Sequence, residues 1–494
     1  MEASERAYPR LLRASTARCL SLTALTLVSG FGLAAALRGG ASPGVALTAW
    51  APALAAVATA RSREAFGIGF GVGLCAAVGS LGFLYSTSAR YLESAFAGGV
   101  AVAIVALAIA LPIGAAVAIG ARLGRPRGLA PLGAAIALTL AERFVPSPIP
   151  YPLGTALVGW SDLAQGAATF SVFGLSLVAH LTAAALASAA AAAVKPATPG
   201  VAARVRPTAL AALATVGAVT LAACLQDRAP GLERPSARVQ VLGGPLGGRP
   251  SAPAASADVS LVVAPEAALD GVVGTADGAG LARALVGAGP PVLFGATTRE
   301  GGRLHNRAIL SDEEGRAADW IDKVELIPIA ERTLDLATSY TSSPTDPVLR
   351  LRERRSDREL TVGVTICYEG LFPARVGAAA EGADVLVNLS NDRWFDEPRP
   401  IEAQILALRA RAIETGLTTL RVARSGPSVV IDGDGREITR IDAGGSALVE
   451  LPLGRPATIG RRLGAARDLP WLALAAATGA LGSALTRRTP VRRP

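Results

Sequence analysis

Long apolar runs and one long stretch of mixed polar and apolar residues divide this chain. Eight runs rich in Ala, Leu, Val and Gly are long enough, and carry few enough charges, to be membrane-spanning helices. They cover residues 19–37, 45–60, 66–85, 95–121, 129–145, 166–194, 208–225 and 469–485. Because hydrophobic residues make up 51% of the chain, we expect a polytopic α-helical membrane domain of about eight spans.

Between residues 227 and 468 the pattern changes to short β-branched runs that alternate with helical stretches. Predicted strands cover residues 237–243, 258–266, 291–298, 306–310, 360–369, 383–392, 418–423, 427–435 and 446–453. Residues 401–415 have a helical pattern, and the Asp-Gly steps within 427–435 predict a hairpin turn. A stretch of about 240 residues can bury its own core, so we expect an inserted α/β domain.

Loop charges orient these parts in the membrane. We divide the chain into a seven-span membrane domain (1–226), a globular domain (227–468) and a C-terminal membrane helix with a basic tail (469–494). The short segments that alternate between the spans hold sixteen Lys and Arg on one side and three on the other. Cytoplasmic loops carry the excess of basic residues, so both termini should be cytoplasmic and the globular domain should lie on the far side.

The net charge of +9 first suggests a nucleic-acid partner. Most of the surplus arginines, however, lie next to predicted spans, where they set orientation and meet anionic headgroups. We therefore expect the bilayer as a partner, and no nucleic acid.

Polar residues end three of the predicted strands. They are Glu266 on the 258–266 strand, Cys367, Tyr368 and Glu369 on the 360–369 strand, and Asn391 and Asp392 on the 383–392 strand. Strand ends along one edge of a sheet are where α/β folds build their sites.

Residue counts single out Lys323 and Cys367. The chain has two lysines, Lys195 and Lys323, against forty-six arginines, so a remaining lysine should do something that arginine cannot. Of the four cysteines, Cys367 alone lies within 227–468, where it has no partner for an intradomain disulfide.

Glu266, Lys323 and Cys367 together have the chemistry of a covalent acyl-transfer site. A thiol is a weak nucleophile at neutral pH until a base removes its proton, and Glu266 can be that base. Lys323 can stabilise the thiolate and then the oxyanion that forms when the thiolate attacks a carbonyl. Taken singly, each residue also fits a structural role: a core cysteine, a turn glutamate and a solvated Asp322–Lys323 pair.

The motifs around these residues resemble the nitrilase superfamily. They are APE (264–266), DK followed by LIP (322–328), GVTICYE (363–369) and NLSNDRWF (388–395). Because predicted spans lie on both sides, the chain most resembles the membrane-embedded branch of that superfamily, the apolipoprotein N-acyltransferase family. The resemblance implies a nitrilase-like αββα sandwich inserted into the membrane domain.

The resemblance also implies a role for each matching residue. Glu266 is then the general base, Lys323 the oxyanion stabiliser and Cys367 the nucleophile of a Glu-Lys-Cys triad. Glu331 matches a second essential glutamate, and Tyr368 and Glu369 match residues that support the nucleophile. Four further matches are expected to form the pocket wall: Asn391, Asp392, Trp394 and Phe395.

The implied reaction is a ping-pong acyl transfer in lipoprotein maturation. Cys367 attacks the sn-1 ester of a phospholipid and forms a thioester, which the α-amine of a diacylglyceryl-cysteine lipoprotein then attacks. The resemblance implies no metal and no organic cofactor. It places the protein in the bacterial inner membrane, as a multi-pass protein with the catalytic domain on the periplasmic side.

Two other functions remain open at this point. A membrane-anchored nitrilase-type amidase, or an acyltransferase that acts on a different amine, would keep the same triad. A scaffold or transport protein with a degenerate outer domain should carry ionisable residues within its spans, yet apart from His180 the span interiors hold few. The sequence also departs from the family's pattern: it lacks a Lys-Trp element before residue 258, and Ala264 and Ala267 flank the Pro-Glu pair.

Overall fold

The computed structural model describes residues 2–38, 42–194, 201–225, 235–247, 258–287, 289–328, 330–332, 339–343, 345–352, 358–454 and 456–487. Lys195 lies outside these residues. The chain divides into two compact units. The first comprises Met1–Gly166, Val172–Cys224 and Leu469–Pro494, and the second comprises Ala167–Ser171 and Leu225–Asp468.

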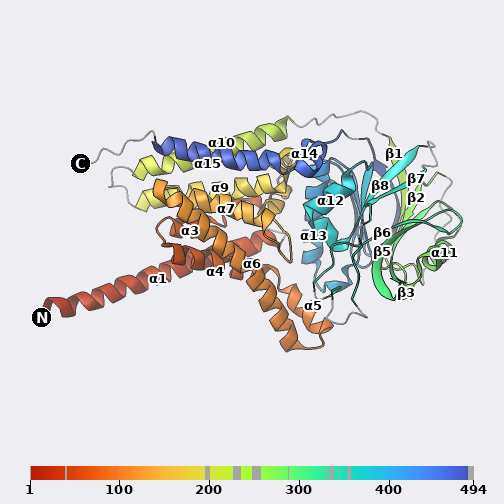
Figure 1. The fold of residues 1–494 in the computed structure, drawn as a ribbon, viewed down its shortest axis with the longest axis horizontal. Helices are drawn as coiled ribbons and strands as arrows, with labels where there is room; N and C mark the ends of the chain where they lie inside the picture. Colours follow the sequence, from red (N-terminus) through yellow and green to blue (C-terminus); the bar gives the residue numbers. More distant parts are fainter. Residues whose placement is uncertain are drawn as a thin grey trace. The chain divides into compact units, whose positions relative to one another are not determined.

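Helices build the first unit (Figure 1). They are α1 (Glu2–Leu37), α2 (Pro43–Thr48), α3 (Ala51–Val57), α4 (Ser62–Ser80), α5 (Phe83–Tyr91), α6 (Ala95–Gly124), α7 (Ala130–Phe144), α8 (Ser161–Ala164), α9 (Ala167–Val194), α10 (Val201–Cys224) and α15 (Leu469–Arg487). The first five residues of α9, Ala167–Ser171, belong to the second unit. Small residues let some of these helices approach closely. A Cβ at Gly120 of α6, for example, would overlap the Gly133 carbonyl of α7.

Five helices in the described residues are long and apolar enough to cross a membrane. The qualifying segments are Thr16–Leu37, Ala95–Arg127, Ala167–Ala193, Pro207–Cys224 and Leu469–Thr486. Helices α4 and α5 make a sixth only if they count as one span bent by 67°. The two other predicted spans are shorter: α2 and α3 together cover Pro43–Val57, with Pro52 as the second residue of α3, and α7 has 15 residues.

Two sheets build the second unit. The first sheet has the order β13-β1-β2-β4-β5-β6, with β3 paired to β4. Its strands are β1 (Ser236–Leu242), β2 (Leu261–Val263), β3 (Val272–Val273), β4 (Val292–Glu300), β5 (Arg303–Ser311), β6 (Ala317–Asp322) and β13 (Ser446–Pro452). The second sheet has the order β12-β11-β10-β9-β8-β7. Its strands are β7 (Val348–Arg352), β8 (Glu359–Ile366), β9 (Val385–Ser390), β10 (Thr419–Ala423), β11 (Ser428–Ile431) and β12 (Glu437–Ile441).

The alternation of side chains along the strands explains why the sheets stack. On β2, Leu261 and Val263 face the core between the two sheets, whereas Val262 faces the opposite side. The helices cover the outer faces: α11 (Thr275–Val286) covers the first sheet, and α12 (Pro373–Ala380) and α13 (Pro398–Thr415) cover the second (Figure 1). The predicted αββα sandwich is therefore confirmed, and β11 and β12 form the predicted hairpin.

Candidate active site

Glu266, Lys323 and Cys367 each lie just beyond the end of a strand. Glu266 follows β2, Lys323 directly follows β6, and Cys367 directly follows β8. All three side chains are buried. Gly295 of β4 makes room for this arrangement, because a Cβ there would lie 2.5 Å from Glu266 Cα.

One lysine holds two glutamates in this cluster. Lys323 Nζ donates to Glu266 Oε1 at 3.0 Å and to Glu331 Oε1 at 2.8 Å. Asn306 of β5 joins the same two oxygens, since its Nδ2 lies 2.7 Å from Glu266 Oε1 and 3.0 Å from Glu331 Oε1. The Lys323 backbone N–H donates to the Asn306 carbonyl at 2.8 Å, so strand pairing brings the two residues together.

Glu331 is fixed by its own loop. Its Oε2 accepts from the Ile327 N–H at 2.8 Å, and its carbonyl accepts from the Tyr340 N–H at 2.9 Å. The Tyr340 hydroxyl in turn lies 3.0 Å from Thr297 Oγ1 of β4. Glu331 is therefore anchored at both carboxylate oxygens, which leaves Glu266 as the less constrained acid.

Glu266 keeps one carboxylate oxygen unbonded. Its Oε2 is buried and has no hydrogen-bond partner among the described residues. A buried carboxylate oxygen without a donor is costly, and such atoms are typical of sites where a proton or a ligand is received. This oxygen can therefore accept the thiol proton.

The backbone at Cys367 has an unusual conformation. Its φ is +49°, in the left-handed region that a residue with a Cβ rarely adopts. Cys367 begins the 3₁₀ turn η3 (Cys367–Leu371), and Asn388 Nδ2 of β9 donates to its carbonyl at 3.2 Å. The thiol interacts electrostatically with both Glu266 and Lys323. Strained backbone at the end of a strand is common at catalytic residues.

Glu369 ties the nucleophile turn to the lysine loop. It is fully buried, and its Oε1 accepts from the Val324 N–H at 2.7 Å while its Oε2 accepts from the Ile366 N–H at 2.8 Å. Arg375 pairs with it at 3.3 Å. Tyr368 is also buried and packs edge-on against Phe372, with ring centroids 4.9 Å apart. Both residues hold the turn that begins at Cys367 in place.

The Asn391 to Phe395 segment follows β9. Asn391 caps the 3₁₀ turn η4 (Asp392–Trp394), and its backbone interacts with the Cys367 thiol. Asp392 is buried, and both of its oxygens accept from Arg421 Nη2, at 2.6 and 2.7 Å. Trp394 and Phe395 are half-buried. Their assignment to the pocket wall stays a prediction.

Burial and neighbouring charges decide the protonation of the site. Burial raises the pKa of the Cys367 thiol well above its ordinary value; the Glu266 charge raises it further and Lys323 opposes both. Burial also raises the pKa of Glu266, an effect that Lys323 reduces and Glu331 increases. For Lys323, burial lowers the pKa, but the two glutamates outweigh it and hold the pKa well above its usual value.

These shifts suit a base-assisted thiol. Cys367 remains a protonated thiol at rest, and a carboxylate with a raised pKa is a better proton acceptor than an ordinary one. Lys323 stays charged beside the Glu266 and Glu331 carboxylates. Within the described part of the chain, no group of three or more His, Cys, Asp and Glu side chains could hold a metal ion.

Three residues of this site escaped the sequence analysis. Asn306 is part of a predicted strand, and its link to Glu266 and Glu331 depends on strand register. Asn388 and Arg421 hold Cys367 and Asp392 from buried strand positions. For Asn388 and Arg421 the available signal was a polar residue within a largely apolar strand run, whereas Asn306 stands among other polar residues of β5 and gave no such signal.

Comparisons with known proteins agree with the fold and the motifs. A family model described as carbon-nitrogen hydrolase matches residues 189–455. An apolipoprotein N-acyltransferase of Brucella melitensis is 30% identical over 169 residues, 30% of this chain and 31% of that protein. A protein of the same name from Bradyrhizobium diazoefficiens is 37% identical over 131 residues, 26% of this chain and 24% of that protein.

Among solved structures, an amidase from Nesterenkonia sp. aligns with 44% of this chain and 90% of its own, at 21% identity and a TM-score of 0.33. The matches to the curated relatives span about three tenths of those proteins' length. The family model, by contrast, covers more than half of the 494 residues. This chain therefore belongs to the carbon-nitrogen hydrolase family, within the nitrilase superfamily.

Proposed function

We propose that this protein transfers an acyl chain from a phospholipid to the α-amine of a diacylglyceryl-cysteine lipoprotein, through a thioester on Cys367. The observation that carries the proposal is the buried cluster in which Lys323 binds Glu266 and Glu331, with the Cys367 thiol in its field. Membrane-spanning helices in the same chain fit lipid-anchored substrates, and the relatives' name points to the same acceptor.

The first half-reaction forms the thioester. The Cys367 proton moves to Glu266 Oε2 as the sulfur attacks the ester carbonyl, and Lys323 stabilises the resulting oxyanion. The oxyanion collapses, the bond to the glycerol oxygen breaks, and that oxygen takes the proton from Glu266. The products are an acyl-Cys367 thioester and a lysophospholipid.

The second half-reaction forms an amide. The lipoprotein amine attacks the thioester carbonyl and gives a proton to Glu266, again beside Lys323. The carbon–sulfur bond breaks, and the departing thiolate regains the proton from Glu266. The enzyme returns to its starting state with no net change in protons.

The location of the protein is part of the proposal. We assign it to the bacterial inner membrane, with the 227–468 domain on the periplasmic side and both termini in the cytoplasm. The support is the excess of basic residues in alternate short segments, counted from the sequence.

Intact-mass spectrometry of the full-length protein in detergent tests the thioester. After incubation with phosphatidylethanolamine we expect one acyl adduct, lost in Cys367→Ala and kept in Cys224→Ala, which removes an exposed free cysteine. A diacylglyceryl peptide should discharge the adduct and become acylated. The proposal fails if folded wild-type protein forms no adduct or if Cys367→Ala still forms it.

The same assay distinguishes the proposed acyl transfer from the alternative function. A protein that releases ammonia from amides or free fatty acid from lipids, and acylates no peptide, would be a membrane-anchored amidase or hydrolase that uses the same triad. Because both enzymes would use the same triad, acylation of the peptide, and not formation of the adduct, distinguishes them.

A further inference from the structure

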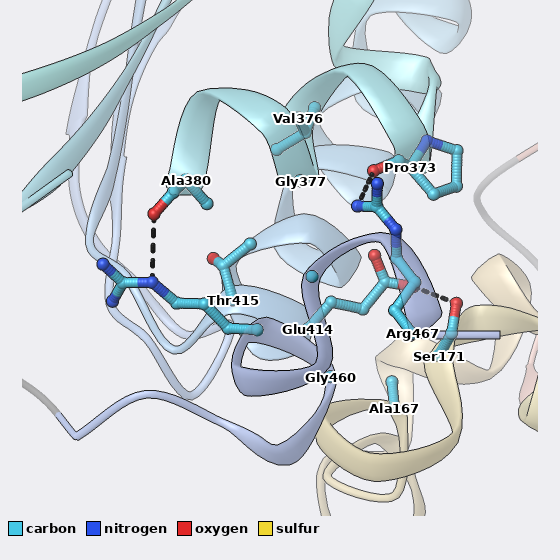
Figure 2. Close-up of a pocket in the computed structure, with 12 residues that line it drawn as sticks. Ala167, Ser171, Pro373, Val376, Gly377, Ala380, Glu414, Thr415, Gly460 and Arg467 are labelled. Atoms are coloured by element: carbon cyan, nitrogen blue, oxygen red, sulfur yellow. Dashed lines mark hydrogen bonds between the residues drawn. The ribbon is translucent and has the colours of Figure 1, made fainter. Parts of the chain in front are cut away.

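A hollow that two arginines line lies in the second unit, formed by residues other than the triad (Figure 2). It contains about 440 Å³ of empty space, its open mouth included. Twelve residues line it, all assigned to the second unit: Ala167, Ser171, Pro373, Val376, Gly377, Ala380, Glu414, Thr415, Gly460, Arg461, Gly464 and Arg467.

Two arginines, Arg461 of α14 (Ile459–Leu463) and Arg467 just after it, hold this part of the chain against α12 and the residues that follow α12. Arg467 donates to the Pro373 carbonyl at 2.8 Å and to the Ala374 carbonyl at 3.1 Å (Figure 2). Arg461 donates to the carbonyls of Ala380, at 3.0 Å, and Ala383, at 2.6 Å. Each guanidinium has five N–H donors. Among the described residues these bonds use only two from each, so both retain donors for a ligand.

The charges of the hollow favour an anion. Its one acid, Glu414, accepts from Ser171 Oγ at 2.7 Å and pairs with Arg411, whose Nε lies 3.1 Å from Glu414 Oε2. The buried Arg411 opposes the charge of Glu414, and Asp384, which also acts on Arg461, pairs with Arg358 at 3.1 Å, so positive charge remains in excess at Arg461 and Arg467. A pair of guanidinium groups is well suited to phosphate oxygens.

The lining residues also belong to the ends of two candidate spans. Ala167 and Ser171 are in the first turns of α9, whose 167–193 segment could cross a membrane. Arg467 precedes the 469–486 span by two residues. Chain connectivity alone therefore places both sides of the hollow at the depth of lipid headgroups.

We propose that this hollow binds the phosphate of a phospholipid headgroup, with Arg461 and Arg467 as its ligands. The site does not depend on the reaction that Cys367 performs, and no triad residue lines it. Gly377 supports it, because a Cβ there would overlap the Arg467 guanidinium. The glycine lets Arg467 lie flat against α12.

Lipid titration followed by native mass spectrometry tests this site. The full-length chain is delipidated in detergent, in a Cys367→Ala background so that no donor is consumed, and titrated with phosphatidylglycerol. Besides any donor phospholipid held at the Cys367 site, we expect one tight phospholipid whose affinity falls roughly tenfold in Arg467→Ala, the effect of one charged hydrogen bond. Gly377→Ala should weaken binding similarly, because alanine suits a helix and only displaces the guanidinium. Arg462→Ala, the control, removes an exposed neighbouring charge and should bind like the parent.

Two further ligands identify what is recognised. Diacylglycerol with the same acyl chains should not fill the tight site, because it lacks the phosphate. Equal binding of diacylglycerol, or unchanged binding in both Arg467→Ala and Gly377→Ala, would overturn the proposal. Inorganic phosphate that binds as tightly as the lipid would also overturn it and indicate a free-anion site. An acyl adduct on Cys367 plays no part in this result, so the two proposals fail independently.

Discussion

Two buried ion clusters in the second unit differ in how completely their carboxylate oxygens are bonded. At the end of β9, Asp392 and Arg421 are both fully buried, and both Asp392 oxygens are bonded by the arginine. At the end of β2, Glu266 shares Lys323 with Glu331 and keeps Oε2 unbonded. We call the first pair closed because both carboxylate oxygens are bonded, although Arg421 Nε has no partner among the described residues; the second cluster has two acids for one lysine and an open acceptor oxygen.

The choice of cation follows this difference. In the closed pair a single guanidinium nitrogen, Arg421 Nη2, donates to both Asp392 oxygens, and Nη1 donates to the Pro427 carbonyl at 2.7 Å. An ammonium is a compact point charge that can serve two acids and still stabilise an oxygen that develops charge during a reaction. A closed pair contributes to structure, and an open one remains available for chemistry.

The largest effect on the acylation rate should come from replacing Glu266, whose Oε2 is unbonded. Glu266→Gln keeps the shape but removes the base, so the rate of Cys367 acylation should fall about 10²–10⁴-fold. Stopped-time mass spectrometry of the adduct measures this rate. Glu314→Gln, on an exposed turn, serves as the control and should react normally. A Glu266→Gln protein that acylates at the wild-type rate would show that another group takes the proton.

Replacing Lys323 by arginine, the cation of the Asp392–Arg421 pair, should have the next largest effect. Lys323→Arg keeps the charge, but the larger planar group cannot occupy the lysine's position between Glu266 and Glu331. We expect a loss of about 10²–10³-fold in acylation, the range for a lost oxyanion donor. Near-normal turnover in Lys323→Arg would show that charge alone suffices.

Removing the charge of Asp392 from the Asp392–Arg421 pair should mainly lower the stability of the fold. Asp392→Asn leaves Arg421 as a buried charge without a counter-charge, which should cost about 3–5 kcal/mol of folding free energy. Thermal unfolding of the full-length protein in detergent should show a lower Tm. Asp270→Asn is the matched control: its pair with Arg424 is exposed at the acid and should contribute at most about 1 kcal/mol. Equal Tm losses in both variants would contradict the distinction.

The smallest effect should be a shift in pH dependence. Acylation needs ionised Glu266, so its rate should fall as the pH drops through the pKa of this group, which burial and the Glu331 charge raise. Glu331→Gln removes the like charge, so in the activity that this variant retains the acid limb of the rate profile should move to lower pH. A limb that stays in place, or moves to higher pH, would show that Glu331 does not influence the base.

Strand signals were strong wherever β-branched residues were concentrated. The predicted runs at 237–243, 291–298 and 418–423 correspond to β1, β4 and β10. Strands β6 and β7 were missed because their sequences, AADWID and VLRLR, mix exposed polar positions with few β-branched residues. Strand β3 has only two residues, too few for any pattern.

The residue types of the candidate site could be predicted, but its connections could not. The motifs located Glu266, Lys323 and Cys367, because each stands in a distinctive local sequence. The bond from Asn306 to both glutamates depends on how β5 pairs with β6 and on the loop that carries Glu331. Hydropathy alone likewise could not show that α4 and α5 bend by 67° or that residues 43–57 form two short helices, α2 and α3.

The backbone conformation at Cys367 affects which variants of this chain a laboratory selection would recover. Four non-glycine residues in the described structure have positive φ, and three of them are Cys367, Ala267 beside Glu266, and Ser171 in the arginine-lined hollow. Each such residue costs about 1–3 kcal/mol. Glycine at position 367 would relieve its share and destroy the nucleophile, so a library selected only for thermostability should enrich inactive variants there. Selection for turnover alone would keep the cysteine.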